Sequence, residues 1–277
     1  MSERPSASRS GVVRQYRREG LNRPRSEVLA TEEPFEIRLN AEGQEIKASI
    51  TMRTPGNDFE LAVGFLYAES VLAGKQDFHS VRYCQPTDEQ QYNVVTVDLR
   101  GPMPDTATLD RNFYSNSGCG VCGKASLDQL AITGVPPLGE GPKLSPELIL
   151  SLPERLKKGQ KLFAKTGGVH AAGLFDAEGK LLAVREDVGR HNALDKLVGW
   201  ALLQDRLPLT DHTILVSGRA SYELVQKALR AGAGVMCAVS APSSLAVDLA
   251  ARFGMTLVGF LRDDSFNVYT GEQRVQE

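Results

Sequence analysis

Two cysteines three positions apart, Cys119 and Cys122, are the side chains of this sequence best suited to covalent chemistry. They lie in the segment GCGVCG at residues 118–123, where glycine precedes and follows the pair. This spacing can supply half of a zinc site, a dithiol redox centre, or a cysteine that carries sulfur as a persulfide. The thiolate is the reactive form in each case.

The residues around the pair favour the sulfur carrier and leave the other two possibilities open. A structural zinc site usually takes four Cys or His ligands, and Cys84 and Cys237 fall in strand-like segments without a second ligand pair. A thioredoxin-like pair begins a helix after a strand, whereas residues 115–118, SNSG, predict no strand. A carrier cysteine must move between donor and acceptor, and a loop flanked by glycine permits that movement.

A zinc nucleobase deaminase also combines an α/β sheet with a CxxC pair. That class needs a His-x-Glu motif upstream and a proline before the first cysteine. Gly118 stands before Cys119, and no histidine of this sequence is followed by Glu two positions later. We therefore expect no deaminase metal chemistry.

The composition excludes several classes of protein. The chain has 277 residues, a net charge of -2 and a pI near 6.2, so it has no general attraction for nucleic acid or anionic lipid. Its apolar runs are far shorter than the roughly 20 residues that span a bilayer. The N-terminus has no apolar stretch of a secretory signal. We expect a cytoplasmic protein with neither nucleic acid nor membrane as partner.

The first part of the chain divides into an arm, a small domain and a loop. Residues 1–28 are rich in Arg, Ser and Pro and predict a disordered arm, either a solvated tail or a docking arm for an acidic partner. Residues 29–110 predict an α+β subdomain with a hairpin over 35–52, a helix from Asn57 or Asp58, and a strand over 92–99. Residues 111–128 predict a mobile loop that carries the two thiols.

The second part, residues 129–277, predicts a larger α/β domain. A hairpin over 171–187 precedes a helix over 191–203. Three apolar strands then alternate with two helices, over residues 213–217, 222–231, 235–239, 244–253 and 256–261. Such alternation indicates parallel strands with right-handed crossovers. The expected fold class is α/β within an α+β chain.

Parallel sheets bind ligands beyond the carboxyl ends of their strands, where helix N-termini supply free amides. The loops at those ends contain Ser217 and Arg219, then residues 240–244, then residues 262–265. Hydroxyls, amides and arginines on one edge suit a phosphate or pyrophosphate group.

Two further polar side chains have either a binding or a structural role. His170 follows a pair of glycines near a strand start, and such glycines let a ligand approach the backbone closely. His170 either contacts a ligand or has a structural role, with its ring nitrogens hydrogen-bonded within the protein. Arg190 lies at a turn between strand and helix beside Asp187. There, Asp187 could simply cap the helix and pair with Arg190, or Arg190 could contribute to cofactor binding.

Taken together, six motifs resemble one known family, the FdhD family of formate dehydrogenase accessory sulfurtransferases. They are GCGVCG at 118–123, TGGVHAAGLFD at 166–176, REDVGRHNALDK at 185–196, LVSGRASYELVQKA at 215–228, SAPSSLAV at 240–247 and GFLRDDSFNVYT at 259–270. The resemblance runs from about residue 33 to residue 270 and leaves the Arg-rich arm outside.

The resemblance implies a function, a substrate and partners. A protein of this family takes persulfide sulfur from a cysteine desulfurase and passes it to the molybdenum bis(molybdopterin guanine dinucleotide) cofactor before insertion into formate dehydrogenase. A guanine nucleotide can occupy the same site, and no permanent metal is implied. The resemblance also implies a homodimer and a three-layer C-terminal domain similar to the cytidine deaminase fold.

The resemblance also assigns residues. Cys119 corresponds to the cysteine that bears the persulfide, and Cys122 supports it. The cofactor-binding segment corresponds to Phe260, Leu261, Arg262, Asp263, Asp264 and Ser265. A common family form there is GFLRGDRFNVYT, so an aspartate in place of glycine and a serine in place of a basic residue change the charge of this contact.

Overall fold

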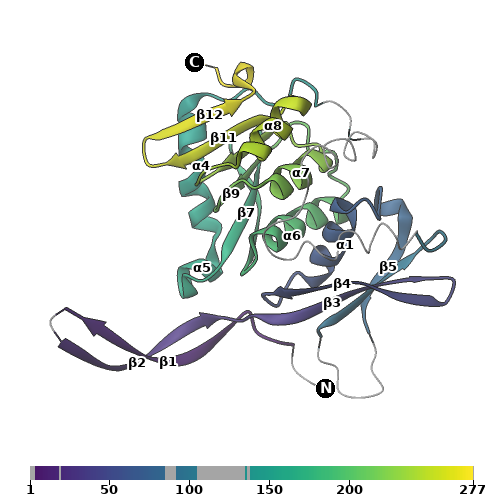
Figure 1. Cartoon of the computed structure of the whole chain (residues 1–277), viewed down its shortest axis with the longest axis horizontal. Helices are drawn as coiled ribbons and strands as arrows, with labels where there is room; N and C mark the ends of the chain where they lie inside the picture. Colours follow the sequence, from purple (N-terminus) through teal and green to yellow (C-terminus); the bar gives the residue numbers. More distant parts are fainter. Residues whose placement is uncertain (1–3, 19, 85–91, 105–134, 136–137, 277) are drawn as a thin grey trace.

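The computed structural model describes residues 4–18, 20–84, 92–104, 135 and 138–276 of the chain. Cys119, Cys122 and the whole loop predicted at 111–128 lie outside the described residues. The described part forms a two-stranded hairpin, a four-stranded sheet and a six-stranded sheet (Figure 1). None of its helices is long and apolar enough to cross a membrane.

The four-stranded sheet has the order β4-β3-β6-β5. Its strands are β3 (Glu33–Ala41), β4 (Gln44–Arg53), β5 (Phe78–Tyr83) and β6 (Val94–Leu99). Alternate side chains of β3, namely Phe35, Ile37 and Leu39, are fully buried, as expected of a strand with one face on a core. The hairpin of β3 with β4, the helix α1 (Asp58–Ala68) and the strand β6 confirm the sequence predictions, whereas β5 and the short helix η1 (Lys75–Asp77) were not predicted.

The six-stranded sheet has the order β12-β11-β10-β9-β7-β8. Its strands are β7 (His170–Phe175), β8 (Leu181–Asp187), β9 (Thr213–Val216), β10 (Val235–Ala238), β11 (Thr256–Arg262) and β12 (Ser265–Thr270). The central strands β9, β10 and β11 are parallel, as predicted. The outer strands β7, β8 and β12 pair antiparallel, so the sheet is mixed.

Helices cover both faces of this sheet. On one face, α6 (Arg190–Leu203), α7 (Tyr222–Arg230) and α8 (Ser244–Phe253) bury one set of alternating strand residues. On the other face, α4 (Pro146–Gly159) buries the alternate set, and the short α5 (Lys161–Thr166) follows it. The result is three layers, helix, sheet and helix (Figure 1).

The two sheets share one hydrophobic core because α1 crosses α6 at two glycines. A Cβ atom on Gly64 would lie 1.9 Å from the carbonyl oxygen of Asp195, and one on Gly199 would lie 1.8 Å from that of Glu60. The helix backbones therefore touch directly. The larger core accordingly joins Phe35 of β3 to Leu194 of α6.

A buried polar contact also links the two sheets. Asp187 Oδ2 lies 2.6 Å from Lys196 Nζ and accepts a hydrogen bond from Thr54 N at 3.1 Å. Its Oδ1 accepts hydrogen bonds from Gly189 N and Asn192 Nδ2. The prediction that Asp187 caps α6 and pairs with Arg190 is therefore wrong, since Gly189 is the N-cap residue.

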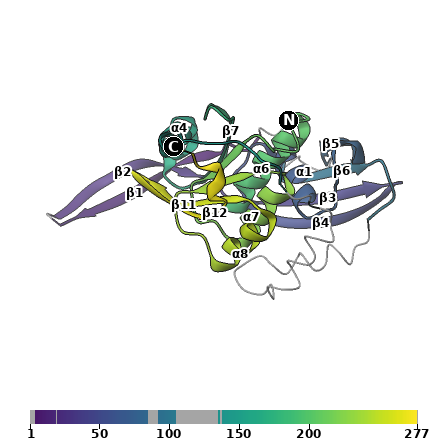
Figure 2. The same ribbon diagram turned by 90° about the horizontal axis from the view of Figure 1, so that it is seen from above.

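The N-terminal arm forms two strands within its described residues, 4–18 and 20–30, where the sequence predicted a disordered arm over residues 1–28. Strands β1 (Ser8–Arg17) and β2 (Gly20–Ala30) pair antiparallel over almost their whole length. Backbone pairing needs no apolar core beneath it, and composition therefore gave no sign of these strands. The hairpin projects from the body of the molecule in both views (Figures 1 and 2). We call it the arm.

Candidate functional site

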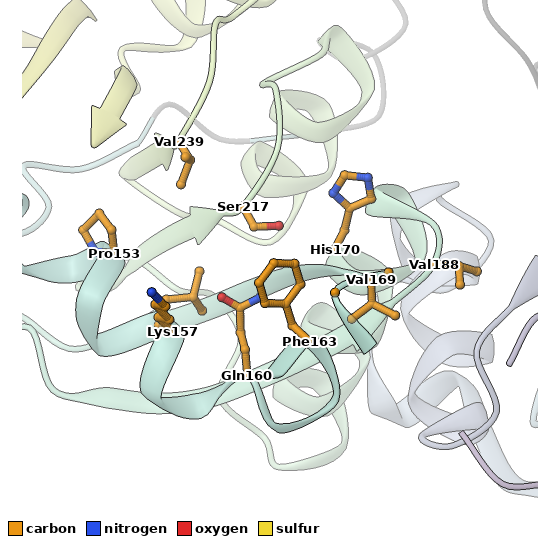
Figure 3. A pocket seen from close by; sticks show the side chains of 12 residues that line it. Pro153, Lys157, Gln160, Phe163, Val169, His170, Val188, Ser217 and Val239 are labelled. Carbon is orange, nitrogen blue, oxygen red and sulfur yellow. The ribbon is translucent and has the colours of Figure 1, made fainter. Parts of the chain in front are cut away.

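A cavity of about 430 Å³ lies where α4 and α5 meet the ends of β7, β9 and β10. The strand side contributes His170 and Ser217, and the helix side contributes Lys157, Gln160 and Phe163 (Figure 3). The remaining lining residues are Pro153, Leu156, Gly167, Gly168, Val169, Val188 and Val239. Apolar walls with a few polar groups are typical of a small-molecule site.

His170 is the titratable group at the strand side of this cavity. It begins β7 opposite Asp187. Burial lowers the pKa of its imidazole below the usual 6.5, and the positive charges of Arg190 and His191 add to this effect. His170 is therefore a neutral ring near pH 7, with one nitrogen to donate and one to accept a hydrogen bond. Gly218 leaves room for the ring, since a Cβ there would lie 3.4 Å from His170 Nδ1.

Ser217 follows β9 and is fixed by the neighbouring strand. Its Oγ accepts a hydrogen bond from Ala171 N at 2.9 Å, and its own amide donates to Ala171 O at the same distance. The side-chain oxygen is thus held in place while its proton remains available to donate. The structure places Ser217 and His170 in the lining of one cavity, although the two residues were predicted separately, Ser217 at the sheet edge and His170 near a strand start.

Arg190 stands at the start of α6, close enough to His170 to affect its pKa. Its Nε is buried and has no hydrogen-bond partner among the described residues. The next residue, His191, lies 2.8 Å from Glu223 and 3.3 Å from Ser221. Since a buried donor without a partner is unfavourable, the Arg190 guanidinium is suited to an anionic ligand.

The helix side of the cavity is held in position by Glu186 of β8. Its carboxylate accepts hydrogen bonds from Leu162 N at 2.9 Å and Phe163 N at 2.8 Å. These are the second and third amides of α5, whose N-cap residue Gln160 makes no side-chain cap. A carboxylate at this end stabilises a helix, so Glu186 fixes the turn that carries Phe163.

The loops that follow β9 and β10 run side by side. Ser240 N donates to Gly218 O, and Ala220 N donates to Ala241 O, both at 3.2 Å. Ser243 Oγ caps α8 by accepting from Ala246 N. Arg219, in the first of these loops, is exposed and does not line the cavity.

The predicted cofactor-binding segment spans the end of β11, the turn at Asp263 and Asp264, and the first residue of β12. Phe260 has a positive φ of 51° and donates its amide to Ser240 O, so the segment starts beside the β10 loop. Arg262 stacks on the Phe260 ring, and Asp263, Asp264 and Ser265 are exposed. Leu261, in contrast, is fully buried in the core under α4. None of the six residues lines the cavity.

The two cysteines within the described residues differ in environment. Cys237 is buried in β10, in agreement with the strand predicted there, and burial raises the pKa of its thiol to about 12. Cys84 is half-buried beside Thr96 and Arg38. Among the residues that the structure describes, no group of three or more His, Cys, Asp or Glu side chains could hold a metal.

The helix α4, which forms one side of the cavity, was not predicted from the sequence. The signal was present, because Ser145 precedes Pro146 and apolar residues recur at helical spacing through Ile149, Leu152 and Leu156. Serine before proline at a helix start is a recognised N-terminal pattern. Reading it would have predicted α4, and with it Lys157 at the cavity.

The fold is that of a mixed α/β protein with a cavity at the ends of the parallel strands β9 and β10. The model of the FdhD/NarQ family matches residues 30–276. The chain belongs to this family.

Full-length relatives support this assignment. The sulfur carrier protein FdhD of Streptomyces coelicolor is 53% identical over 264 residues, which cover 93% of this chain and 92% of that protein. That of Mycobacterium tuberculosis is 51% identical over 91% and 92% of the two chains. A crystal structure assigned as a formate dehydrogenase accessory protein of Desulfotalea psychrophila superposes with a TM-score of 0.76 at 25% identity, covering 98% of this chain and all of the other.

Proposed function

We propose that this protein carries sulfur during the maturation of formate dehydrogenase. It accepts sulfur from a cysteine desulfurase as a persulfide and passes it to the molybdenum bis(molybdopterin guanine dinucleotide) cofactor before that cofactor enters the enzyme. The names of the relatives, sulfur carrier and formate dehydrogenase accessory protein, support this proposal. The cofactor is cargo in this scheme, and formate dehydrogenase is the client.

In the loading step, the Cys119 thiolate attacks the terminal sulfur of the desulfurase persulfide. The sulfur–sulfur bond of the donor breaks, a new one forms on Cys119, and the desulfurase cysteine leaves as a thiolate. The exchange needs no oxidant or reductant. Cys122 supports the persulfide, either by holding it in position or by attacking Cys119 to release the sulfur as hydrosulfide with formation of a disulfide.

The cavity is the proposed acceptor site, and one observation supports this assignment: His170 and Ser217 line the same space. Arg190 does not line the cavity, but it lies close enough to His170 to lower the pKa of that ring. A volume of about 430 Å³ is in the range of small-ligand pockets. It suits one portion of the large cofactor. Ser217 and Arg190 can donate to phosphate oxygens, and neutral His170 can donate or accept.

The rest of the cofactor is proposed to extend along the same edge of the sheet. Arg219 and the turn of residues 260–265 lie on loops beyond the parallel strands, outside the cavity. Leu261 does not contact the cofactor in this proposal, because its side chain is buried; it anchors the segment in the hydrophobic core. The exposed Arg262 stacked on Phe260 offers a cation for a second phosphate.

Two broader features belong to the same proposal. The three layers formed by α4, the larger sheet and α6 to α8 support a similarity of residues 129–277 to the cytidine deaminase fold. The proposed setting is the cytoplasm, where thiols stay reduced, with the protein acting as a homodimer.

Intact-protein mass spectrometry tests the loading step. Incubation with a cysteine desulfurase and free cysteine should add one sulfur to the wild-type protein and to Cys122→Ala, and none to Cys119→Ala. Complementation of a strain that lacks the accessory factor tests the whole scheme with the same variants. Unmodified wild-type protein, or full complementation by Cys119→Ala, would refute the carrier role.

Metal analysis separates this scheme from its main rival, a zinc-stabilised module that delivers the cofactor without handling sulfur. Stoichiometric zinc that disappears in both Cys119→Ala and Cys122→Ala would favour that rival.

A further inference from the structure

One polar side chain in the lining of the cavity is almost fully buried and has no hydrogen-bond partner among the described residues. Gln160 is 7% exposed and lines the cavity at the junction of α4 and α5. Its backbone bonds to Lys157 and Ala164, whereas its carboxamide makes no hydrogen bond within the described part of the chain. Figure 3 shows this group beside the Phe163 ring, pointing toward the side of the cavity where Ser217 lies. A buried polar group without a partner is unfavourable, so the carboxamide is suited to a ligand in the cavity.

An aromatic ring lies next to this carboxamide. Phe163 is 39% exposed, lines the same cavity, and follows Gln160 by three residues. Its backbone amide donates to Glu186 at 2.8 Å, so the ring has a fixed attachment to the sheet. Planar ligands stack on aromatic side chains, and a ligand stacked on Phe163 can present its edge to Gln160. We therefore expect a planar ring as the ligand.

The charges around the cavity exclude a cationic ligand. None of the described residues that line it is acidic, and Lys157 supplies a positive charge at the helix side. His170 is neutral near pH 7, because burial lowers the pKa of its ring, and the positive charge of nearby Arg190 lowers that pKa further. A ring that is itself neutral and that carries an anionic group therefore fits these charges best.

The chemistry of the carboxamide narrows the choice of ring. A carboxamide has an acceptor oxygen beside a donor NH₂ group, so it pairs with a ligand edge that carries one donor beside one acceptor. A cyclic amide has such an edge, because the ring holds its N–H and C=O groups on the same side. In a peptide the amide is almost always trans, which places the two groups on opposite sides. The cavity therefore fits a cyclic amide better than a peptide segment.

We propose that Gln160 determines which ring the cavity accepts, and that this ring is a cyclic amide stacked on Phe163 with its phosphate toward Ser217. This assignment rests on the proposed function and names the kind of ring of the cofactor that enters the cavity. The cofactor contains two such rings, guanine and pterin, each with an N–H group beside a carbonyl. Adenine carries its donor and acceptor in the opposite order, and the carboxamide can turn over to meet it, so Gln160 selects the class of ring.

Calorimetry on the full chain tests this role, with guanosine diphosphate (GDP), inosine diphosphate (IDP) and carboxypterin as probes. IDP lacks only the exocyclic amino group of GDP and keeps the cyclic amide, so the wild type should bind both with affinities within about threefold of each other. Gln160→Leu removes both hydrogen-bonding groups at similar volume and should bind GDP and IDP at least about tenfold more weakly. The matched control, Gln204→Leu, changes an exposed glutamine at the C-cap of α6 and should bind like wild type.

Gln160→Glu separates recognition of the ring from a structural role. At about pH 8 a carboxylate is ionised and accepts hydrogen bonds without donating any. It can accept from the ring N–H and from the amino group of GDP, whereas IDP offers it only the ring N–H. The variant should therefore bind GDP at least about tenfold more tightly than IDP, and Gln204→Glu should leave the ratio of the two affinities unchanged. Because this ratio is measured within one variant, it does not depend on the stability of that variant.

The ring whose affinity falls in Gln160→Leu, guanine or pterin, is the one that the cavity takes. The proposal is overturned if the wild type binds neither GDP nor carboxypterin, or if Gln160→Leu binds both like wild type. It is also overturned if Gln160→Glu binds GDP and IDP equally while Gln160→Leu weakens GDP binding.

Sulfur loading on Cys119 of the wild type is a separate measurement. An unloaded protein whose ring binding depends on Gln160 would refute the carrier role alone. A loaded protein whose ring binding does not depend on Gln160 would refute this assignment alone.

Discussion

Removing the charge of Asp187 should strongly destabilise the protein, because its carboxylate is the centre of the buried contact between the two sheets. Asp187 is 0% exposed, and its partner Lys196 is 1% exposed. In Asp187→Asn, the side-chain oxygen can still accept hydrogen bonds from Gly189 N and Asn192 Nδ2. The new NH₂ group then faces Thr54 N and Lys196 Nζ, which are both donors. The lysine then remains buried as a cation without its counter-charge.

The expected cost is about 3–5 kcal/mol, the usual penalty for breaking a buried ion pair from one side. Lys196 keeps hydrogen bonds to Thr54 O at 2.8 Å and Glu186 O at 3.4 Å, which places the cost toward the lower end. For a chain of this size, each kcal/mol lowers the melting temperature by about 2–4 °C. Asp187→Asn should therefore melt at least about 6 °C below wild type.

Urea unfolding followed by circular dichroism measures the effect, with two comparisons. Adding Lys196→Met to Asp187→Asn should recover about 2 kcal/mol or more, since the double variant leaves no buried charge. Asp205→Asn breaks the exposed pair with Lys75 and should cost less than about 1 kcal/mol. The reasoning is refuted if Asp187→Asn matches the Asp205 control, or if the double variant is no more stable than the single one.

Four other predictions concern the cavity and the helix crossing. Lys157→Ala should weaken binding of a guanine nucleotide about threefold to tenfold in calorimetry, whereas Lys158→Ala, on the solvent side of the same helix, should not change it. Glu186→Ala removes the cap of α5 and should cost about 1 kcal/mol, seen as faster amide exchange in that helix alone. Gly199→Ala should cost at least about 3 kcal/mol in urea unfolding, because a methyl group cannot fit against the Glu60 carbonyl; wild-type stability would contradict this contact. Finally, the lowered pKa of His170 means that the unfolded chain binds its proton more tightly, so the unfolding free energy should fall as pH drops below 6.5, and His170→Gln should reduce that fall.

Local patterns were sufficient to predict most elements around the parallel strands. Short apolar runs bounded by glycine and serine gave β9, β10 and β11 and the helices between them, because each element of such a sheet follows its neighbour in sequence. The position of Ser217 at the carboxyl end of β9 followed from the same topology, whereas its proximity to His170 did not. These parts of the fold are determined by residues that are close to one another in the sequence.

Long-range contacts explain what the sequence analysis missed. Asp187 pairs with Lys196 and with Thr54, which lies 133 residues earlier in the chain. No residue near Asp187 in the sequence indicates this contact. The arm is held by cross-strand backbone pairing, for which its Arg-rich composition gives no signal. Glu186 acts on α5 from a strand 23 residues further along, so its capping role was equally hidden.

The backbone contact at Gly64 and Gly199 limits how this protein can move. Side chains that separate two helices can change rotamer and let the helices slide. Here peptide groups meet directly, and sliding would press the larger side chains next to the two glycines against the facing backbone. The two sheets are therefore a single rigid frame. Small-angle scattering of the free and nucleotide-bound protein should superimpose, and any rearrangement that accompanies sulfur delivery must occur in the connecting segments rather than between the halves.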